Sequence, residues 1–114
     1  MTARVARLPP LNETEFLRQV LDLATLLGWH AAHFRPARTA RGWRTPVQGS
    51  LGAGFPDLVL VRVRDQRLVL CELKSDTGKL SPRQVEVHDI LRAAGRDVRV
   101  WRPNQWDEIA EVLR

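Results

Sequence analysis

The segment GFPDLVLVRVRDQRLVLCELK, residues 54–74, decides the fold of this chain. It contains two apolar runs, residues 57–63 and 67–73, separated by the polar triplet Arg64-Asp65-Gln66. Apolar runs of this length, joined by a short polar turn, are typical of paired strands. Because the runs are nearly continuous and do not alternate, we predict a β-hairpin that is buried on both faces or nearly so.

Charged residues stand at one end of this predicted hairpin. Asp57 opens the first strand, whereas Glu72 and Lys74 end the second. Side chains alternate across a strand, so Glu72 and Lys74 project from the same face. The hairpin turn brings the start of the first strand beside the end of the second. The pattern therefore predicts that two carboxylates and an ammonium group converge at one end of the sheet.

Converging carboxylates beside a core are costly unless they are paired or bind a metal. Oxygen ligands suit a hard divalent cation, so we predict Mg²⁺, with Mn²⁺ as its substitute. Asp57 and Glu72 are the candidate ligands, together with the main-chain carbonyl of Leu73. Lys74 is then a candidate for holding the attacking water or for neutralising charge in the transition state of phosphodiester hydrolysis. The alternative is a simple ion pair between Lys74 and one of the acids, which would only anchor the strand end.

Four arginines, Arg35, Arg38, Arg41 and Arg44, fall within one short stretch that contains no acidic residue. The chain has 114 residues and a formal net charge of +5, which indicates one domain with a surface that attracts nucleic acid. No acidic residue occurs between Asp22 and Asp57. Trp43 lies within this interval and is a candidate for stacking on a base or for packing within the loop. The predicted DNA-binding residues are Arg35, Arg38, Arg41, Trp43, Arg44 and Lys79.

The rest of the chain predicts an α/β fold in the order α-β-β-β-α-β-α, with a mixed four-stranded sheet flanked by helices. Residues 1–11 are expected to form a flexible basic arm, and residues 12–114 a single domain. The expected elements are a helix from the cap Asn12 to Gly28, a weak strand at 29–34, a loop at 35–53, a helix from the cap Ser81 to Gly95 with its apolar face at Val85, Ile90, Leu91 and Ala94, a strand at 97–101, and a last helix capped by Asn104.

These motifs, in this order, resemble the PD-(D/E)xK nuclease superfamily. GFPD at 54–57, ELK at 72–74 and Gln84 in the following helix are most similar to its VRR-Nuc family, including the small stand-alone versions found in phages. The similarity extends to GW at 28–29, VWRP at 100–103 and the closing helix. It implies a restriction-endonuclease-like core and metal-dependent cleavage of structured DNA. In the small versions it also implies a homodimer that acts on four-way (Holliday) junctions.

The resemblance also implies two further site residues. The family carries a Glu of the first helix at the metal site, and this chain offers Glu13 and Glu15. Glu15 already fits a capping box with Asn12, whereas Glu13 extends the buried face of the helix, so we choose Glu13 as a catalytic and metal-site residue. Gln84 is expected to line the active site, and its alternative role is the capping partner of Ser81.

We therefore predict a Mg²⁺-dependent endodeoxyribonuclease in which Asp57, Glu72, Lys74, Glu13 and Gln84 form the catalytic site. The alternatives are a catalytically silent DNA-binding module on the same fold and a protein-interaction subunit. No membrane partner is expected, because no apolar run approaches 18 residues. The lone Cys71 cannot form an internal disulfide. We accordingly expect a cytoplasmic location, in a bacterium or a phage-infected cell.

Overall fold

The computed structural model describes residues 11–34, 37–40, 42–44 and 47–114 of the chain. The predicted basic arm therefore lies outside the described residues, except for Leu11, which is partly buried against the core. None of the helices in the described ranges is long and apolar enough to cross a membrane.

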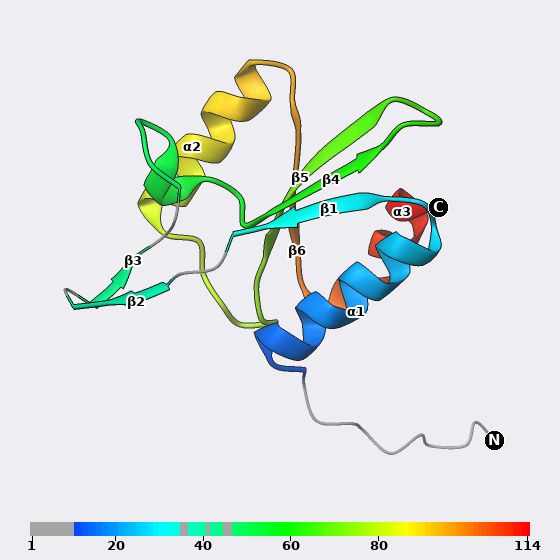
Figure 1. The fold of residues 1–114 in the computed structure, drawn as a ribbon, viewed down its shortest axis with the longest axis horizontal. Coiled ribbons are helices and arrows are strands. Elements are labelled where there is room, and N and C mark those ends of the chain that lie inside the picture. The colour runs from blue at the N-terminus through cyan, green and yellow to red at the C-terminus, as the bar shows by residue number, and fades with distance from the viewer. Residues whose placement is uncertain (1–10, 35–36, 41, 45–46) are drawn as a thin grey trace.

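Figure 1 shows helices around a central sheet, with a separate ribbon of β2 and β3. The elements are α1 (Glu13–Leu26), β1 (His30–His33), β2 (Ala37–Thr39), β3 (Gly42–Arg44), the 3-10 turn η1 (Gly52–Gly54), β4 (Leu58–Arg62), β5 (Arg67–Leu73), α2 (Pro82–Ala93), β6 (Asp97–Trp101), the 3-10 turn η2 (Pro103–Gln105) and α3 (Trp106–Leu113). The predicted order of helices and central strands is confirmed.

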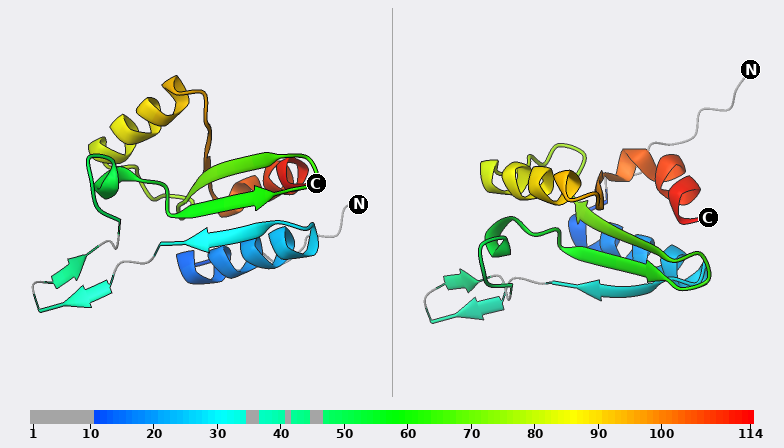
Figure 2. Two further views of the ribbon diagram at one scale, coloured as in Figure 1. Left: turned by 45° about the horizontal axis from the view of Figure 1, so that its top comes forward. Right: turned by 90° about the horizontal axis from the view of Figure 1, so that it is seen from above.

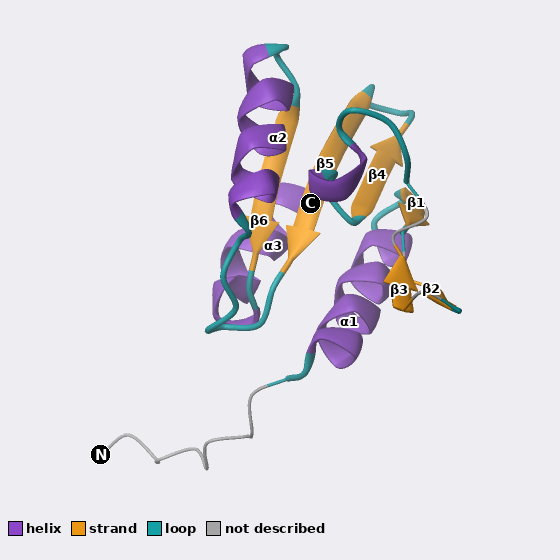
Figure 3. Cartoon of the chain, turned by 90° about the vertical axis from the view of Figure 1, so that its left-hand side faces the viewer, coloured by secondary structure: helices purple, strands orange, loops and turns teal. Residues whose placement is uncertain are grey.

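The central sheet has the strand order β1-β4-β5-β6, and Figure 3 shows these strands side by side. β4 pairs antiparallel with both β1 and β5, whereas β5 and β6 are parallel. This is the mixed four-stranded sheet that the sequence predicts. The hairpin of β4 and β5 supplies its two inner strands, which explains why their apolar runs are nearly continuous.

The main core lies between the sheet and the helices α1 and α3. Its buried members are Phe16, Val20, Ala24, Trp29, Leu58, Leu60, Val69, Cys71, Leu73, Trp101, Ile109 and Leu113. Since side chains alternate across a strand, Glu72 projects from the opposite face to its neighbours Cys71 and Leu73. His88 of α2 contacts Glu72, so α2 covers that second face.

The predicted apolar face of α2 is wrong. Val87 and His88 are its buried residues, whereas Val85 is 45% exposed and Ile90 is 46% exposed. Contacts at the start of the helix set its rotation, because a Cβ at Gly54 would lie only 2.7 Å from Val87 Cγ2. Hydrophobic residues at irregular spacing did not indicate which side of the helix this contact selects.

Two further expectations differ from the structure. The stretch predicted as a loop at 35–53 contains the antiparallel ribbon of β2 and β3 and the turn η1. Asn104 does not cap the last helix, because it lies inside η2 and α3 begins at Trp106. The Asn104 N–H instead donates to Oδ1 of Asp76, at 2.9 Å, in the loop after β5. Tertiary contacts of this kind are invisible to local capping patterns.

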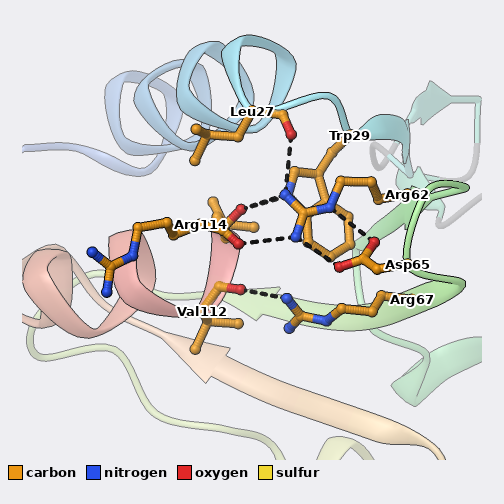
Figure 4. A network of polar contacts seen from close by, with 8 residues as sticks. Leu27, Trp29, Arg62, Asp65, Arg67, Val112 and Arg114 are labelled. Atoms are coloured by element: carbon orange, nitrogen blue, oxygen red, sulfur yellow. Dashed lines mark hydrogen bonds and ion pairs between the residues drawn. The ribbon is translucent and has the colours of Figure 1, made fainter.

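A buried arginine ties the far end of the sheet to both of these core helices (Figure 4). Arg62, at the end of β4, is only 2% exposed, lies 4.5 Å above the Trp29 ring and pairs with Asp65 at 2.9 Å. Its N–H groups also donate to the carbonyls of Leu27, Leu113 and Arg114. Positive charge is favourable at helix C-termini, so this contact fixes the ends of α1 and α3.

Candidate active site

The two inner strands bring the predicted acids together. The register of β4 and β5 ends with Leu58 paired with Cys71. Asp57 directly precedes Leu58 and Glu72 directly follows Cys71, so a continuation of this register by one residue sets Asp57 opposite Glu72. The main-chain N–H of Leu73 donates to Oδ1 of Asp57 at 3.3 Å. The N–H and C=O of one strand residue point to the same edge, so the Leu73 carbonyl also faces Asp57. Residues 57 and 72–73 thus form one continuous polar edge.

This polar edge opens into a pocket with a volume of about 210 Å³. Its lining residues are Glu13, Phe34, Ala53, Phe55, Asp57, Glu72, Lys74 and Gln84. The rings of Phe34 and Phe55 meet edge to face, with centroids 5.9 Å apart, and give the pocket an apolar side. Sequence reasoning missed both rings, because each follows or precedes a strand in a stretch without periodicity.

The first helix contributes Glu13 to the pocket, from its first turn. Glu15 is not among the lining residues, and its main-chain N–H donates to Oδ1 of Asn12 at 2.8 Å. The negative charge of Glu13 raises the pKa values of both Asp57 and Glu72, although it is not the main cause of either shift.

Burial makes both strand acids reluctant to ionise. It raises the pKa of Asp57 to about 6, against the opposing effects of the Leu73 N–H and the Lys74 charge. It raises the pKa of Glu72 to about 8, and the neighbouring Asp57 adds to that shift. The two carboxyl groups lie close together and both have raised pKa values. This indicates a site without enough positive charge to stabilise their ionised forms.

Lys74 supplies part of that charge without forming a close pair. Its ammonium lowers the pKa values of Asp57 and Glu72. Yet none of the ion pairs between described residues includes Lys74. The simple ion pair, which was the alternative interpretation of the motif, is therefore not formed. Lys74 remains available to a group that enters the pocket.

The GFPD turn is seated directly on the start of α2. A Cβ at Gly54 would lie 2.4 Å from the main-chain oxygen of Arg83, so only glycine allows this approach.

Next in the helix, Gln84 accepts the Ser81 N–H at 2.9 Å and donates its own main-chain N–H to Ser81 Oγ at 3.1 Å. Gln84 thus closes the capping box and also lines the pocket, so both of its expected positions hold.

The family model of the VRR-NUC domain matches residues 15–105, which is most of the chain. The chain belongs to the VRR-NUC domain family. No curated protein and no solved structure matches it. The match includes Asp57, Glu72, Lys74 and Gln84, whereas Glu13 lies just before its first residue. The VRR-NUC domain is a nuclease-type domain, and such domains act on DNA and generally use divalent metal ions.

In this VRR-NUC domain, side chains supply only part of the set of donor atoms that a divalent cation needs. Across the described ranges, no three His, Cys, Asp or Glu side chains are close enough together to hold a metal ion. The pocket does offer two carboxylates, Asp57 and Glu72. Leu73 is not one of its lining residues, although the main chain of Leu73 lies at the same strand edge. Oε1 of Glu72 is buried without a hydrogen-bond partner. Mg²⁺ usually keeps several waters and needs only one or two carboxylates, so this donor set fits it.

Four of the six predicted DNA-binding residues of the VRR-NUC domain lie in the part of the chain that the structure describes. Arg35 and Arg41 lie outside the described residues. The main chain of Arg38, Trp43 and Arg44 belongs to the β2–β3 ribbon, which projects from the domain in both views of Figure 2. The chain enters the ribbon after Phe34 and returns to Ala53, and both of these residues line the pocket. Lys79 is exposed in the loop between β5 and α2.

Proposed function

We propose that this VRR-NUC protein is a Mg²⁺-dependent endodeoxyribonuclease that hydrolyses phosphodiester bonds in structured or branched DNA. The observation that carries the proposal is the opposition of Asp57 and Glu72 across the β4–β5 pair, inside a pocket whose lysine forms no ion pair with the described residues. Structural acids rarely sit together in a buried place, whereas two acids that hold a cation there would serve a metal-dependent hydrolysis of a phosphodiester.

Each residue of the pocket then has a distinct task. Asp57, Glu72 and the Leu73 carbonyl would hold the cation. Glu13 would bind a water molecule in the outer hydration shell of the cation. A bound divalent cation supplies positive charge to the scissile phosphate and makes a nearby water more acidic. Lys74 reaches the same space and stabilises the negative charge that develops on the phosphate oxygens. Gln84 offers an amide at the start of α2, where it orients the phosphate or the attacking water.

The charge and the position of the arginine-rich stretch, residues 35–44, point to DNA as the substrate. The arginine-rich stretch leaves the domain at Phe34 and returns at Ala53, so a DNA strand held by it would pass over the pocket. Phosphate contacts are the main source of affinity for DNA. A domain of this size covers few base pairs, and cutting both strands of a junction symmetrically is simplest with a homodimer. Light scattering that shows a monomer under cleavage conditions would remove the dimer from this proposal.

The test is cleavage of a panel of labelled DNA substrates: a four-way junction, a flap, a nicked duplex and a linear duplex. Each is incubated with Mg²⁺ or with EDTA. We expect cleavage only with Mg²⁺, and a loss of about 100-fold or more in Asp57→Asn, Glu72→Gln and Lys74→Ala. Glu108→Gln is the matched control, because it removes one exposed acid from α3, away from the pocket.

The same variants separate the competing functions. Isothermal titration with Mn²⁺ should show a site that Glu72→Gln abolishes. A catalytically silent DNA-binding module would bind the junction without any metal site that depends on Glu72. A protein-interaction subunit would bind DNA with little dependence on salt. Full cleavage activity in Asp57→Asn or Lys74→Ala would refute the proposed site.

A further inference from the structure

A histidine of α2 lies against the buried side of Glu72. Nε2 of His88 is 3.8 Å from Oε1 of Glu72, and the two side chains are 0% and 5% exposed. Neither ring nitrogen of His88 nor Oε1 of Glu72 has a hydrogen-bond partner among the described residues. Two of these buried polar atoms, Nε2 of His88 and Oε1 of Glu72, thus face each other at this contact, and Glu72 also lines the pocket.

Such a contact is unusual for a residue that only fills space. Most buried polar atoms in proteins are hydrogen-bonded, and each unpaired one costs about 1–3 kcal/mol. A leucine at the position of His88 would fill much of the same volume without any unpaired nitrogen. A partner gained in another state of the site would offset this cost, and Oε1 of Glu72 is a polar atom within reach.

The chemistry of the two groups decides which bond can form. A neutral imidazole carries one N–H, on either of its two ring nitrogens. A neutral ring cannot form an ion pair with Glu72, but an Nε2–H can donate to an ionised carboxylate. Closing 3.8 Å to a normal hydrogen bond needs a movement of about 1 Å or less. A bond to Oε1 leaves the second oxygen of Glu72 directed at the pocket.

The helix that carries His88 is well fixed, which this role requires. The capping box of Ser81 and Gln84 defines the first turn of α2. The close approach of Gly54 to Arg83 and Val87 prevents the helix from sliding along the sheet. Val87, directly before His88, is fully buried. His88 can therefore act as a rigid support, while Glu72 is the group that moves.

We propose that His88 is a positioning residue for Glu72, whose Nε2–H binds Oε1 of the ionised carboxylate and aims the other oxygen at the cation. This inference rests on the proposed nuclease function, because it assigns Glu72 to the metal. Hydrogen bonds from outside the coordination sphere commonly orient metal ligands, and their loss weakens metal binding or activity about 10–100-fold.

The first experiment measures Mn²⁺ affinity by isothermal titration, without DNA or turnover. His88→Leu removes the donor, whereas His88→Gln retains an N–H near the position of Nε2. We expect binding about 10-fold weaker or more in His88→Leu and within about 3-fold of the wild type in His88→Gln. Equal Mn²⁺ affinity in His88→Leu and the wild type would overturn the inference. If the wild type shows no Mn²⁺ site that depends on Glu72, the proposed function fails as well.

A second measurement uses the unmodified protein, so it does not depend on the folding of a variant. Nitrogen NMR of the imidazole rings reports which ring nitrogen carries the proton. We expect the Nε2–H form of His88 in the presence of Mg²⁺. The chemical shift of this proton should change when Mg²⁺ is added to the wild type but not when it is added to Glu72→Gln. An Nδ1–H form with Mg²⁺ present would exclude the bond and overturn the inference.

Discussion

The main-chain N–H of Leu73 donates to Oδ1 of Asp57 at 3.3 Å, and this contact joins the GFPD turn to the end of β5. It holds the Asp57 side chain at the position where the strand pairing of β4 ends. One oxygen of Asp57 is thereby engaged, so the carboxylate is oriented before any ligand arrives. Orientation of this kind lowers the entropy that a site must lose on binding.

The raised pKa of Glu72 predicts that the metal-free protein becomes less stable as pH rises. Its pKa is 4.5 in the unfolded chain and about 8 when folded, so between these values only the folded state holds the proton. Glu72 should therefore make the free energy of unfolding fall with pH, with a slope approaching about 1.4 kcal/mol per pH unit. Asp57 adds to this fall up to about pH 6, whereas His88, whose pKa burial lowers, opposes it at the acidic end of the range. The measurement is urea denaturation in EDTA between about pH 5 and pH 8, the window that these pKa values define.

Glu72→Gln is the control for this pH effect, because it cannot ionise. The difference in stability between the wild type and Glu72→Gln should grow in favour of the variant as pH rises. Saturating Mg²⁺ should stabilise the wild type most at the upper end of this range, because the cation binds the ionised form. A pH-independent difference would show that Glu72 ionises normally in the folded protein.

Gly54→Ala should disturb both folding and the site. The new Cβ would lie 2.4 Å from the main-chain oxygen of Arg83, which cannot move without shifting α2. Overpacking of this kind costs about 1–3 kcal/mol. We expect that loss in urea denaturation, together with weaker Mn²⁺ binding. Gly78→Ala is the matched control, because its nearest neighbour at 3.0 Å is the flexible Ser75 side chain.

Arg62→Ala should unfold the far end of the domain more easily while leaving the chemistry intact. The substitution removes the Arg62 donor from the carbonyls of Leu27, Leu113 and Arg114 and removes the guanidinium that lies 4.5 Å above the Trp29 ring. Trp29 Nε1 still donates to the Leu113 carbonyl, and the Arg67 guanidinium stays over the Trp29 ring. We expect the melting temperature to fall by roughly 10 °C, as seen in thermal denaturation.

The control for Arg62→Ala is Arg114→Ala, since the Arg114 side chain is 75% exposed and its ion pair among the described residues is with Glu111, across one turn. Its melting temperature should change little. Cleavage by the folded Arg62→Ala protein should match the wild type at a temperature well below both melting transitions. A lower rate per folded molecule would mean that the far end of the sheet is coupled to the pocket.

The arginine-rich stretch predicts a measurable salt dependence. The combined substitution of Arg38, Arg41 and Arg44 by alanine should weaken binding to all DNA substrates alike. It should reduce the slope of log affinity against log salt by roughly 0.9 for each DNA phosphate that the variant no longer neutralises. Mn²⁺ affinity should be unchanged, because the substitutions leave the residues of the pocket in place.

An equal change of net charge elsewhere provides the comparison for this triple variant. Arg64, Arg96 and Arg114 are exposed residues at the opposite end of the sheet from the pocket, and their combined alanine substitution should keep most of the salt slope. If both triple variants bind DNA equally weakly, the ribbon has no special role and only the overall charge matters.

The sheet and its pair of acids could be predicted because their signals are local. Strand alternation places Glu72 and Lys74 on one face, and the length of the hairpin turn decides that Asp57 lies opposite Glu72. By contrast, the face of α2 was predicted wrongly, because Val85 and Ile90 are apolar yet exposed. Which side of a helix is buried depends on the surface it meets, and that surface came from the distant GFPD turn.

The amino-acid sequence by itself determined the order of the elements, the hairpin and the acids at its end, since these follow from periodicity and chain geometry within one continuous segment. Only the tertiary structure decided that Phe34 and Phe55 wall the pocket, that Gln84 serves both a cap and the pocket, and that His88 lies behind Glu72. The physical reason is that these contacts join separate elements through close packing. Packing depends on the shapes of both partners, and no local pattern encodes the shape of a distant partner.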